Sequence, residues 1–399
     1  MAAERPIYLD HAATTPMLPA AVAALAEESA RVGNPSSVHA AGRAARRVVD
    51  ESRERIAALL GAHPTEVVLT SGGTEADNLA VVGLYRARRT ADPRRRRILV
   101  SAIEHHAVLD PVAHLAEREG AEVVHLPVDR VGRVCLDALA TELADHPDAT
   151  ALVSLMWANN EVGTVQPLAE VVALAAAHGV PVHTDAVQAV GRLPVHLAAS
   201  GVAALTTSAH KIGGPVGVGA LLVRRGVALE PVLHGGGQER GLRPGTTPAA
   251  LVRSFAVALD AALADLEVEV ARVAALRDAL VAGVLREVPD AVVRGPWPDG
   301  DAARACLPTH AHLTVPGATS EALLFGLDQR GIAASAGSAC QAGVQQPSHV
   351  LRAMGVPDDE ARGALRLTLG RTSTQADVDA LVAVIGDVVA RARAAAAVG

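Results

Sequence analysis

The sequence predicts an α/β protein with a large domain built on a mostly parallel sheet and a smaller α+β domain after it. Three observations support this. The chain has 399 residues, which is too long for one ordinary domain, and half of them are hydrophobic. Helical periodicity alternates with short apolar strands from about residue 19 to 225. A long amphipathic helical stretch then follows at 249–288 and indicates the link to a second domain.

The first part repeats strand, helix, strand, which predicts parallel strands with helices on both faces of the sheet. In chain order, we expect helices at 20–32 and 40–62, a strand at 66–70, a helix after 71–77, a strand at 97–102, a helix around 112–120, strands at 121–128 and 150–156, a helix at 169–179, and strands at 180–186, 204–210 and 218–223. The second part has expected strands at 311–317, 331–337 and 363–370 and a terminal helix at 376–396.

Composition and charge exclude several classes of partner. The net charge is −7 and charges of both signs are scattered, which argues against nucleic acid because phosphate binding needs a basic face. The one basic run, Arg94–Arg97, is expected to be a solvated loop; a docking patch for an acidic partner protein is the alternative.

The three cysteines, Cys135, Cys306 and Cys340, are far apart and include no CxxC pair, so neither disulfides nor a zinc cluster are expected. The sixteen histidines show no ligand spacing, and no metal is predicted. The first residues lack the pattern of a signal peptide, and no run of about eighteen apolar residues occurs. We therefore expect a soluble, cytoplasmic protein without a membrane partner.

Polar residues follow five of the predicted strands, where ligands of such sheets bind. Each has an ordinary structural explanation when taken alone, and Lys211 alone reads as a solvated loop lysine. Together they provide a helix N-terminus for a phosphate, a flat imidazole, a carboxylate, amide groups and a desolvated lysine that could act as a nucleophile. This set matches the needs of pyridoxal phosphate (PLP). The residues are Thr74, His105, Asn159, Asn160, Asp185, Gln188, Ser208, His210 and Lys211.

Motifs along nearly the whole chain resemble the NifS/IscS-type cysteine desulfurases of group I, which are class V aminotransferases and PLP enzymes of fold type I, the aspartate aminotransferase-like fold. The resemblance implies a large PLP-binding domain at 16–255 and a small domain made of 1–15 and 256–399. The matching stretches are 8–16, 33–46, 70–78, 104–109, 158–167, 183–191, 208–221, 234–246, 335–340 and 365–371.

The resemblance also implies roles for single residues. Lys211 would bind the aldehyde carbon of PLP, Asp185 would pair with the pyridinium nitrogen and His105 would stack on the ring. Gln188 and Asn160 would bond near the phenolic oxygen. The phosphate would be held by Gly73, Thr74, Ser208 and His210, and by Thr246 of a second subunit. Arg366, assisted by Asn34, would bind the substrate carboxylate.

Cys340 separates the desulfurases from other PLP enzymes, because only sulfur transfer needs a thiol nucleophile. The implied reaction converts L-cysteine to L-alanine and leaves a persulfide on Cys340, which lies in the small domain. The sulfur would pass to a scaffold or carrier protein for iron–sulfur cluster assembly or for thiolation of tRNA or cofactors. The resemblance also implies a homodimer with shared sites.

Several alternatives stay open at this point. A selenocysteine lyase, or another PLP-dependent aminotransferase or lyase, would share the fold and the cofactor residues. A non-catalytic scaffold is disfavoured because Lys211 and Asp185 are both present. Pro244 and Gln341 depart from the family pattern, where a serine and a small hydroxyl residue are usual. Cys135 and Cys306 match no motif of the family.

Overall fold

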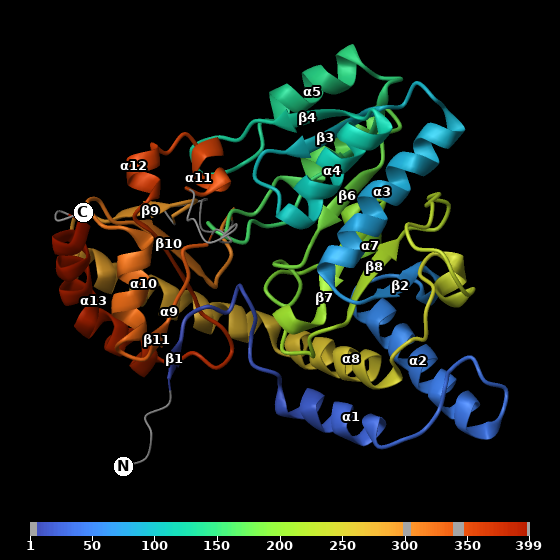
Figure 1. The fold of residues 1–399 in the computed structure, drawn as a ribbon, viewed down its shortest axis with the longest axis horizontal. Coiled ribbons are helices and arrows are strands. Elements are labelled where there is room, and N and C mark those ends of the chain that lie inside the picture. Colours follow the sequence, from blue (N-terminus) through green and yellow to red (C-terminus); the bar gives the residue numbers. More distant parts are fainter. Residues whose placement is uncertain (1–5, 298–304, 338–346, 397–399) are drawn as a thin grey trace.

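The computed structural model describes residues 6–297, 305–337 and 347–396. Its larger sheet has seven strands in the order β2-β8-β7-β6-β5-β3-β4 and occupies the right side of Figure 1. Only β8 is antiparallel to its neighbours, so the predicted mostly parallel sheet is confirmed. The strands are β2 (Val67–Thr70), β3 (Arg97–Ser101), β4 (Glu122–Leu126), β5 (Thr150–Ser154), β6 (Val182–Asp185), β7 (Ala204–Ser208) and β8 (Gly219–Val223).

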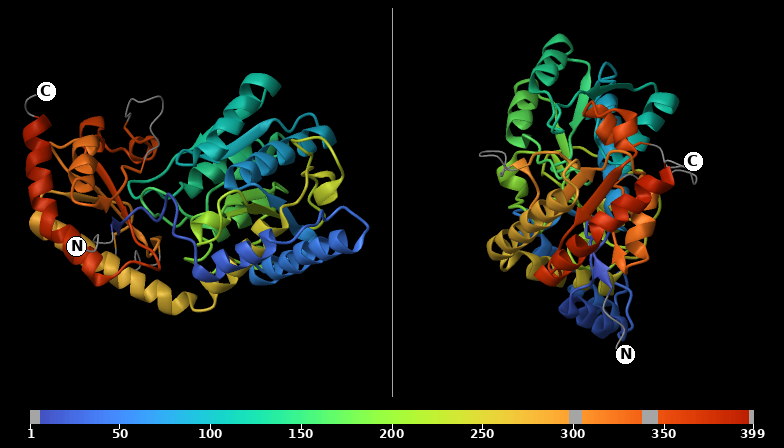
Figure 2. Two further views of the ribbon diagram at one scale, coloured as in Figure 1. Left: turned by 60° about the horizontal axis from the view of Figure 1, so that its bottom comes forward. Right: turned by 90° about the vertical axis from the view of Figure 1, so that its left-hand side faces the viewer.

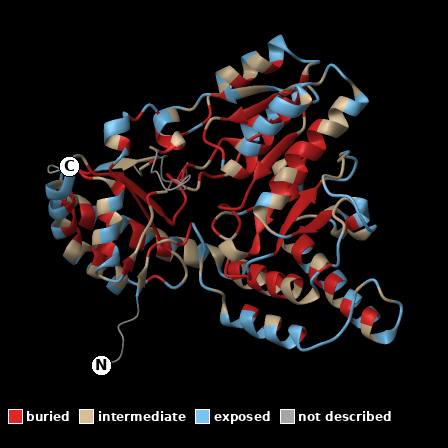
Figure 3. Ribbon diagram, in the orientation of Figure 1, coloured by how far each residue is buried: buried red, intermediate tan, exposed pale blue. Residues whose placement is uncertain are grey.

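Helices cover both faces of this sheet because successive side chains of a strand point to opposite sides and both sides are apolar. Val67 and Leu69 face one hydrophobic cluster, and Val68 between them faces another. Figure 3 shows the strands buried and the outer faces of the helices exposed. The first cluster includes side chains of α2 (Ala40–Leu59), α5 (Leu136–Asp145), α6 (Leu168–Ala177), α7 (Leu197–Ser200) and α8 (Ala249–Leu263). The opposite face is covered by α3 (Gly73–Ala91) and α4 (His106–Glu119), and α1 (Pro19–Ser29) packs outside α8.

A second hydrophobic cluster forms around an antiparallel sheet of order β12-β10-β9, at the left of Figure 1. The N-terminal segment joins this part, because β1 pairs in parallel with β11 and Leu9 lies in the same cluster. Figure 2 shows α9 and α13 side by side along this sheet. The elements are β1 (Ile7–Tyr8), α9 (Leu266–Glu287), β9 (Val292–Arg294), β10 (His310–Thr314), α10 (Ser320–Asp328), β11 (Ile332–Ala333), α11 (His349–Ala353), α12 (Asp358–Ala361), β12 (Ala364–Thr368) and α13 (Gln375–Ala396). Short 3₁₀ turns are η1 (Pro64–Glu66), η2 (Ala209–Lys211) and η3 (Gln238–Gly241).

The helical stretch predicted at 249–288 is two helices, which meet at Ala264 and Asp265. The break separates two packing surfaces, since α8 contributes to the cluster of the large sheet and α9 to the cluster of the small sheet. The predicted domain boundary at 255–256 falls inside α8, which packs on the large sheet up to Ala262. The division into two domains stays a prediction.

Each arginine of the basic run Arg94–Arg97 has an ion-pair or hydrogen-bond partner within the chain. Arg94 pairs with Asp92, Arg96 with Glu122 and Arg97 with Glu142, and Arg95 donates to the carbonyl of Thr150. These contacts favour the loop interpretation over a docking patch. Over the ranges given above, no helix combines the length and the apolar character that crossing a membrane requires.

Candidate active site

A cavity of about 400 Å³ lies at the carboxyl ends of the parallel strands, next to Ala12 and Ala13 of the N-terminal segment. Its other walls come from α3, the loops after β3, β5, β6 and β7, and the C-terminal part of the chain. The cavity brings together most of the predicted site residues: Gly73, Thr74, His105, Asn160, Asp185, Gln188, Ser208, His210, Lys211 and Arg366. Residues as far apart in the sequence as Gly73 and Arg366 thus line one cavity.

Lys211 ends the short η2 turn that directly follows β7. Its Nζ atom donates hydrogen bonds to the carbonyls of Ala12 and Ala13, at 2.6 and 2.8 Å. Burial, together with the positive charges of Arg192 and Arg366, lowers the pKa of Lys211 to about 8. About a tenth of this amine is therefore neutral at pH 7, and only the neutral amine can attack an aldehyde.

Asp185 ends β6, and its Oδ1 atom accepts a hydrogen bond from the main-chain N–H of Val187 at 2.8 Å. Burial, and secondly the carboxyl of Asp77, raise the pKa of Asp185 to about 7. A buried carboxylate of this kind is stabilised when a cation lies beside it. A protonated pyridine nitrogen supplies such a cation, so this residue fits the predicted role.

Two further buried carboxyl groups, Asp77 and Glu104, lie near Asp185, and Asp77 also lines the cavity. Burial raises the pKa of Asp77 to about 7 and that of Glu104 well above its ordinary value. Asp77 lies 3.5 Å from Nε2 of His183, and burial lowers the pKa of that imidazole to about 4. Sequence reasoning did not single out Asp77, Glu104 or His183, although each lies in a stretch that matches the family.

His105 forms the N-cap of α4, where its Nδ1 atom accepts a hydrogen bond from the main-chain N–H of Ala107 at 3.0 Å. This bond fixes the plane of the ring and leaves the other nitrogen to carry the proton. Burial lowers the pKa of His105 below its usual value, so the ring is neutral. A fixed, neutral imidazole in the cavity wall fits a stacking role.

The N-terminus of α3 provides a cradle for an anion. Within the described part of the chain, the buried Oγ atom of Ser208 has no hydrogen-bond partner. A side chain at Gly73 would crowd this region, because its Cβ would lie 3.0 Å from Cγ2 of Val187. Free N–H groups, an unpaired hydroxyl and Thr74 together match the requirements of a phosphate group.

Arg366 enters the cavity from β12 and is almost fully buried. Its Nη1 atom donates to the carbonyl of Asn160 at 2.9 Å, and Nη2 contacts Oδ1 of Asp10 at 2.7 Å. These two partners hold the guanidinium plane in position, and among the described residues the Nε atom has no hydrogen-bond acceptor. Asp10 was missed in the sequence, although it lies in the stretch 8–16.

Three described residues that were predicted for the site, Asn34, Asn159 and Thr246, do not line this cavity. Asn159 is fully buried, and its Oδ1 atom accepts hydrogen bonds from the main-chain N–H groups of Glu161 and Val162. Asn34 is exposed on the loop between α1 and α2, and no described contact joins it to Arg366. Thr246 is exposed at the end of the loop 234–246, which Glu239 holds against Arg53 of α2. Cys340 lies outside the described residues; Ser335 and Gly337, from the start of its motif, line the cavity.

The described residues contain no cluster of three or more side chains that could hold a metal ion. Cys135 and Cys306 are free cysteines. Burial raises the pKa of the Cys306 thiol, which keeps this sulfur in its unreactive protonated form.

Comparison with known proteins agrees with this geometry. Residues 7–381 match the model of the family described as aminotransferase class-V. The chain is 54% identical to an IscS-like cysteine desulfurase of Mycobacterium tuberculosis, over 98% of both chains. It is 41% identical to the cysteine desulfurase NifS of Azotobacter vinelandii, over 97% of this chain and 93% of the relative.

Solved structures give the same result. A NifS-like protein superposes with a TM-score of 0.88 at 33% identity, covering 97% of this chain and 100% of the other. DndA from Streptomyces lividans superposes with a TM-score of 0.74 at 38% identity, covering 91% and 99%. The class V aminotransferases and the NifS/IscS desulfurases depend on PLP, whose aldehyde, ring nitrogen and phosphate each find a matching group in the cavity. The chain belongs to the aminotransferase class-V family and, within it, to the IscS/NifS cysteine desulfurases.

Proposed function

We propose that this cysteine desulfurase converts L-cysteine to L-alanine and holds the sulfur as a persulfide on Cys340. The observation that carries the proposal is the convergence of Lys211, Asp185 and Arg366 on one cavity. An amine, a carboxylate for a ring nitrogen and a guanidinium for a substrate carboxylate are the groups that PLP chemistry on an amino acid requires.

The residues of the cavity divide the binding of PLP among them. Lys211 would hold the aldehyde carbon, Asp185 the ring nitrogen and His105 one face of the ring. Gln188 and Asn160 lie on the same wall and would bond near the phenolic oxygen. The phosphate would be held by Gly73, Thr74, Ser208 and His210. When bound, PLP supplies an electron sink for the charge left on the Cα atom of an amino acid that loses its proton.

The protein's own groups would then perform the reaction. Arg366 binds the substrate carboxylate and so directs the Cα proton toward Lys211, which removes it as a general base. The thiolate of Cys340 attacks the substrate sulfur, so that an S–S bond forms. The C–S bond breaks and leaves its electron pair on the substrate carbon. Protonation of that carbon gives the methyl group, and return of a proton from Lys211 to the Cα atom completes L-alanine.

Three finer points belong to the same proposal. The persulfide sulfur passes to a scaffold or carrier protein, and the names of the NifS and IscS relatives support iron–sulfur cluster assembly as its use. The active unit is a homodimer in which Thr246 of each subunit reaches the phosphate of the other. The protein works in the cytoplasm, with neither nucleic acid nor a membrane as a direct partner.

The test measures alanine and sulfide formed from L-cysteine in the presence of a thiol reductant. Equal amounts of the two products are expected from the native chain. Cys340→Ala is expected to lose both products while the yellow colour of the bound cofactor stays. Cys135→Ala is the matched control and is expected to keep full turnover.

Turnover that is unaffected in Cys340→Ala would contradict the persulfide step and favour another PLP-dependent lyase. Colour without any turnover of L-cysteine, followed by turnover of L-selenocysteine, would point to a selenocysteine lyase.

A further inference from the structure

Arg192 is a buried cation that the reaction above does not use. The residue is only 7% exposed, in the turn after β6. Its guanidinium donates hydrogen bonds to three main-chain carbonyls: Nη1 to Gln188 at 3.1 Å, and Nη2 to Lys211 at 3.3 Å and to His11 at 3.4 Å. Among the described residues, none of the ion pairs includes Arg192.

The three carbonyls belong to three segments that meet at the lysine. One segment contains Lys211 itself, and the second contains Gln188 of the cavity wall. The third is the N-terminal segment, in which the two residues after His11 accept the hydrogen bonds of the lysine amine. One guanidinium therefore fastens both the residue that carries the amine and the carbonyls that orient it.

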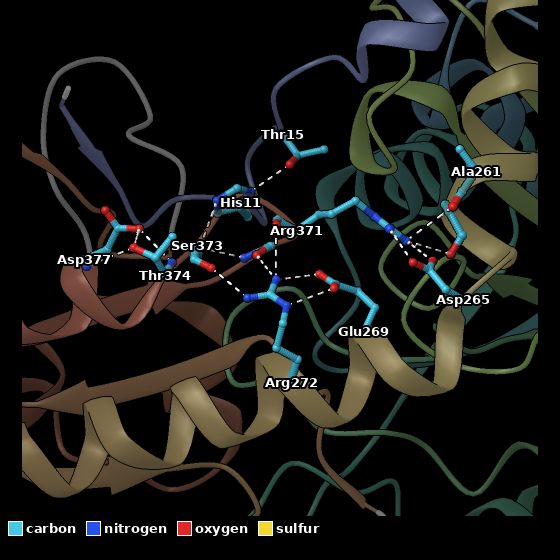
Figure 4. Close-up of polar contacts among 12 residues, drawn as sticks. His11, Thr15, Ala261, Asp265, Glu269, Arg272, Arg371, Ser373, Thr374 and Asp377 are labelled. Atoms are coloured by element: carbon cyan, nitrogen blue, oxygen red, sulfur yellow. Dashed lines mark hydrogen bonds and ion pairs between the residues drawn. The ribbon is translucent and has the colours of Figure 1, made fainter.

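The N-terminal segment is also held from the other side. Figure 4 shows His11 between Thr15, which contacts its Nδ1 atom at 2.7 Å, and Ser373, which lies 3.4 Å from its Nε2 atom. Arg272 in turn binds the carbonyl of Ser373 and the carboxylate of Glu269. The segment that contains His11 is therefore held in place by these contacts. Its carbonyl can in turn fix the position of the Arg192 guanidinium.

Arg192 lies behind the lysine, on the side away from the large cavity. A second cavity of about 70 Å³ there is lined by Arg192, Lys211 and Thr309, among others. Because Arg192 is only 7% exposed, little water screens the charge of its guanidinium. A charge in such surroundings acts strongly on its neighbours.

The charges that face the lysine amine show why Arg192 matters more than the others. Arg192 and Arg366 lower the pKa of Lys211, while Asp185 and Asp10 raise it. Arg366 is paired with Asp10, so its charge is largely cancelled.

The imidazoles of His105 and His210 are neutral at pH 7, because burial lowers the pKa of each. Burial, and after it the charge of Arg192, lowers the pKa of His310; at His210 the charge of Arg192 adds to the effects of burial and of Lys211. The carboxylate of Glu269 and the guanidinium of Arg371 line the small cavity with it; Glu269 is paired with Arg272 and Arg371 with Asp265.

We propose that Arg192 is a positioning residue for Lys211, which it holds through three main-chain carbonyls while its uncompensated positive charge keeps the lysine amine reactive. The inference rests on the proposed function only in that Lys211 is the group that binds PLP. It concerns the lysine before any substrate arrives, so it can be tested without cysteine turnover.

The test follows the uptake of PLP by the full-length chain after removal of its cofactor. The rate at which the yellow colour appears is measured across pH 6 to 10 for the native chain, Arg192→Met and Arg192→Lys. The midpoint of the native profile is expected near the pKa of Lys211, at about 8. Arg192→Met is expected to move it upward by about one pH unit, a tenfold loss of neutral amine at pH 7. Arg192→Lys keeps the charge and is expected to move it by less than half as much.

Arg277→Met is the matched control, because Arg277 is equally buried but its partners are Asp278 and the carbonyl of Leu307. It is expected to lower the melting temperature without moving the midpoint. An unchanged midpoint in a folded Arg192→Met variant would overturn the proposal, and so would equal shifts in Arg192→Met and Arg192→Lys. Should Arg192→Met not fold, Arg192→Gln, whose amide can still donate to carbonyls, is titrated in the same way. Native protein that takes up no PLP at all would instead refute the proposed function.

Discussion

At the residue scale, the site depends on side chains that are chemically unusual because they lack water. Lys211 has carbonyls rather than carboxylates as its hydrogen-bond partners, and carbonyls compensate a positive charge only in part. Asp185, Asp77 and Glu104 are carboxyl groups whose pKa values burial raises. The cavity therefore offers an amine that is easily deprotonated opposite carboxyl groups that lack a cation. A cofactor with an aldehyde and a basic ring nitrogen meets both needs.

Asp185 leads to a prediction about stability and pH. Its folded pKa of about 7 is above the value near 4 of an unfolded aspartate. Between these values the folded chain without PLP binds more protons at this position than the unfolded chain does, so its free energy of unfolding falls as the pH rises from 4 to 7. Asp185→Asn removes this effect. The stability of the variant relative to the native chain is expected to be about 2–3 kcal/mol more favourable at pH 8 than at pH 5.

Urea unfolding of both cofactor-free proteins at the two pH values measures this difference. An identical pH dependence of the two proteins would show that Asp185 is ionised at neutral pH even without a cation beside it. Binding of PLP, by contrast, is expected to be much weaker in Asp185→Asn.

At the scale of elements, the site is assembled from the ends of strands and the starts of helices. Thr70, Ser101, Ser154, Asp185 and Ser208 end five strands that run in one direction, so the residues that follow them meet at one edge of the sheet. Helix N-termini then supply free N–H groups, as at α3 and at α4. In α11 the capping residue has a second role.

Ser348 caps α11 and also binds a buried carboxylate of the large sheet's loops. Its Oγ atom accepts from the main-chain N–H groups of Val350 and Leu351 and donates to Oε2 of Glu161 at 2.5 Å. Ser348→Ala removes the cap and leaves Glu161 buried without its donor. We expect the free energy of unfolding to fall by about 2–3 kcal/mol.

Thr319→Ala is the control, since Thr319 caps α10 through a single bond to Ala322. A loss of about 1 kcal/mol is expected there. Equal losses in the two variants, measured by urea unfolding, would mean that the bond to Glu161 adds nothing to stability.

At the scale of the whole molecule, the cavity forms where the two hydrophobic clusters approach each other. The large sheet supplies Lys211 and Asp185, the small sheet supplies Arg366, and the N-terminal segment lies between them and contributes Asp10. A change that shifts one part against the other would therefore separate the guanidinium from the amine. The contacts of His11 with Thr15 and Ser373 fix this relative position (Figure 4).

The proposed homodimer is tested at the same scale. The exposed position of Thr246, on a loop anchored by Glu239 and Arg53, leaves it free to reach a second subunit. Sedimentation is expected to give a particle of twice 40.8 kDa. Thr246→Ala is expected to lower the affinity for PLP without changing that mass. A native protein that sediments as a monomer would rule out shared sites. So would a Thr246→Ala variant that binds PLP as tightly as the native protein.

Much of the fold could be predicted from local patterns, and the rest could not. Alternating apolar strands and amphipathic helices indicated the large sheet, because burial on both faces needs continuous apolar runs such as that of β5. The break between α8 and α9 was not predicted, because the helical period continues through Ala264 and only the two separate packing surfaces require a bend. The two-residue strand β1 is too short to leave a pattern in the sequence.

The sequence by itself determined the chemistry of the site. Residues at strand ends and family motifs identified Lys211, Asp185, His105 and Arg366, because the identity of a reactive group depends on its residue type. The tertiary structure decided how these groups behave. Only the folded chain brings the carbonyls of Ala12 and Ala13 to the lysine and Asp10 to Arg366, and only it buries Arg192 where no described carboxylate pairs with it. The pKa of a side chain depends on the water and charges around it, and those neighbours come from segments far apart in the sequence.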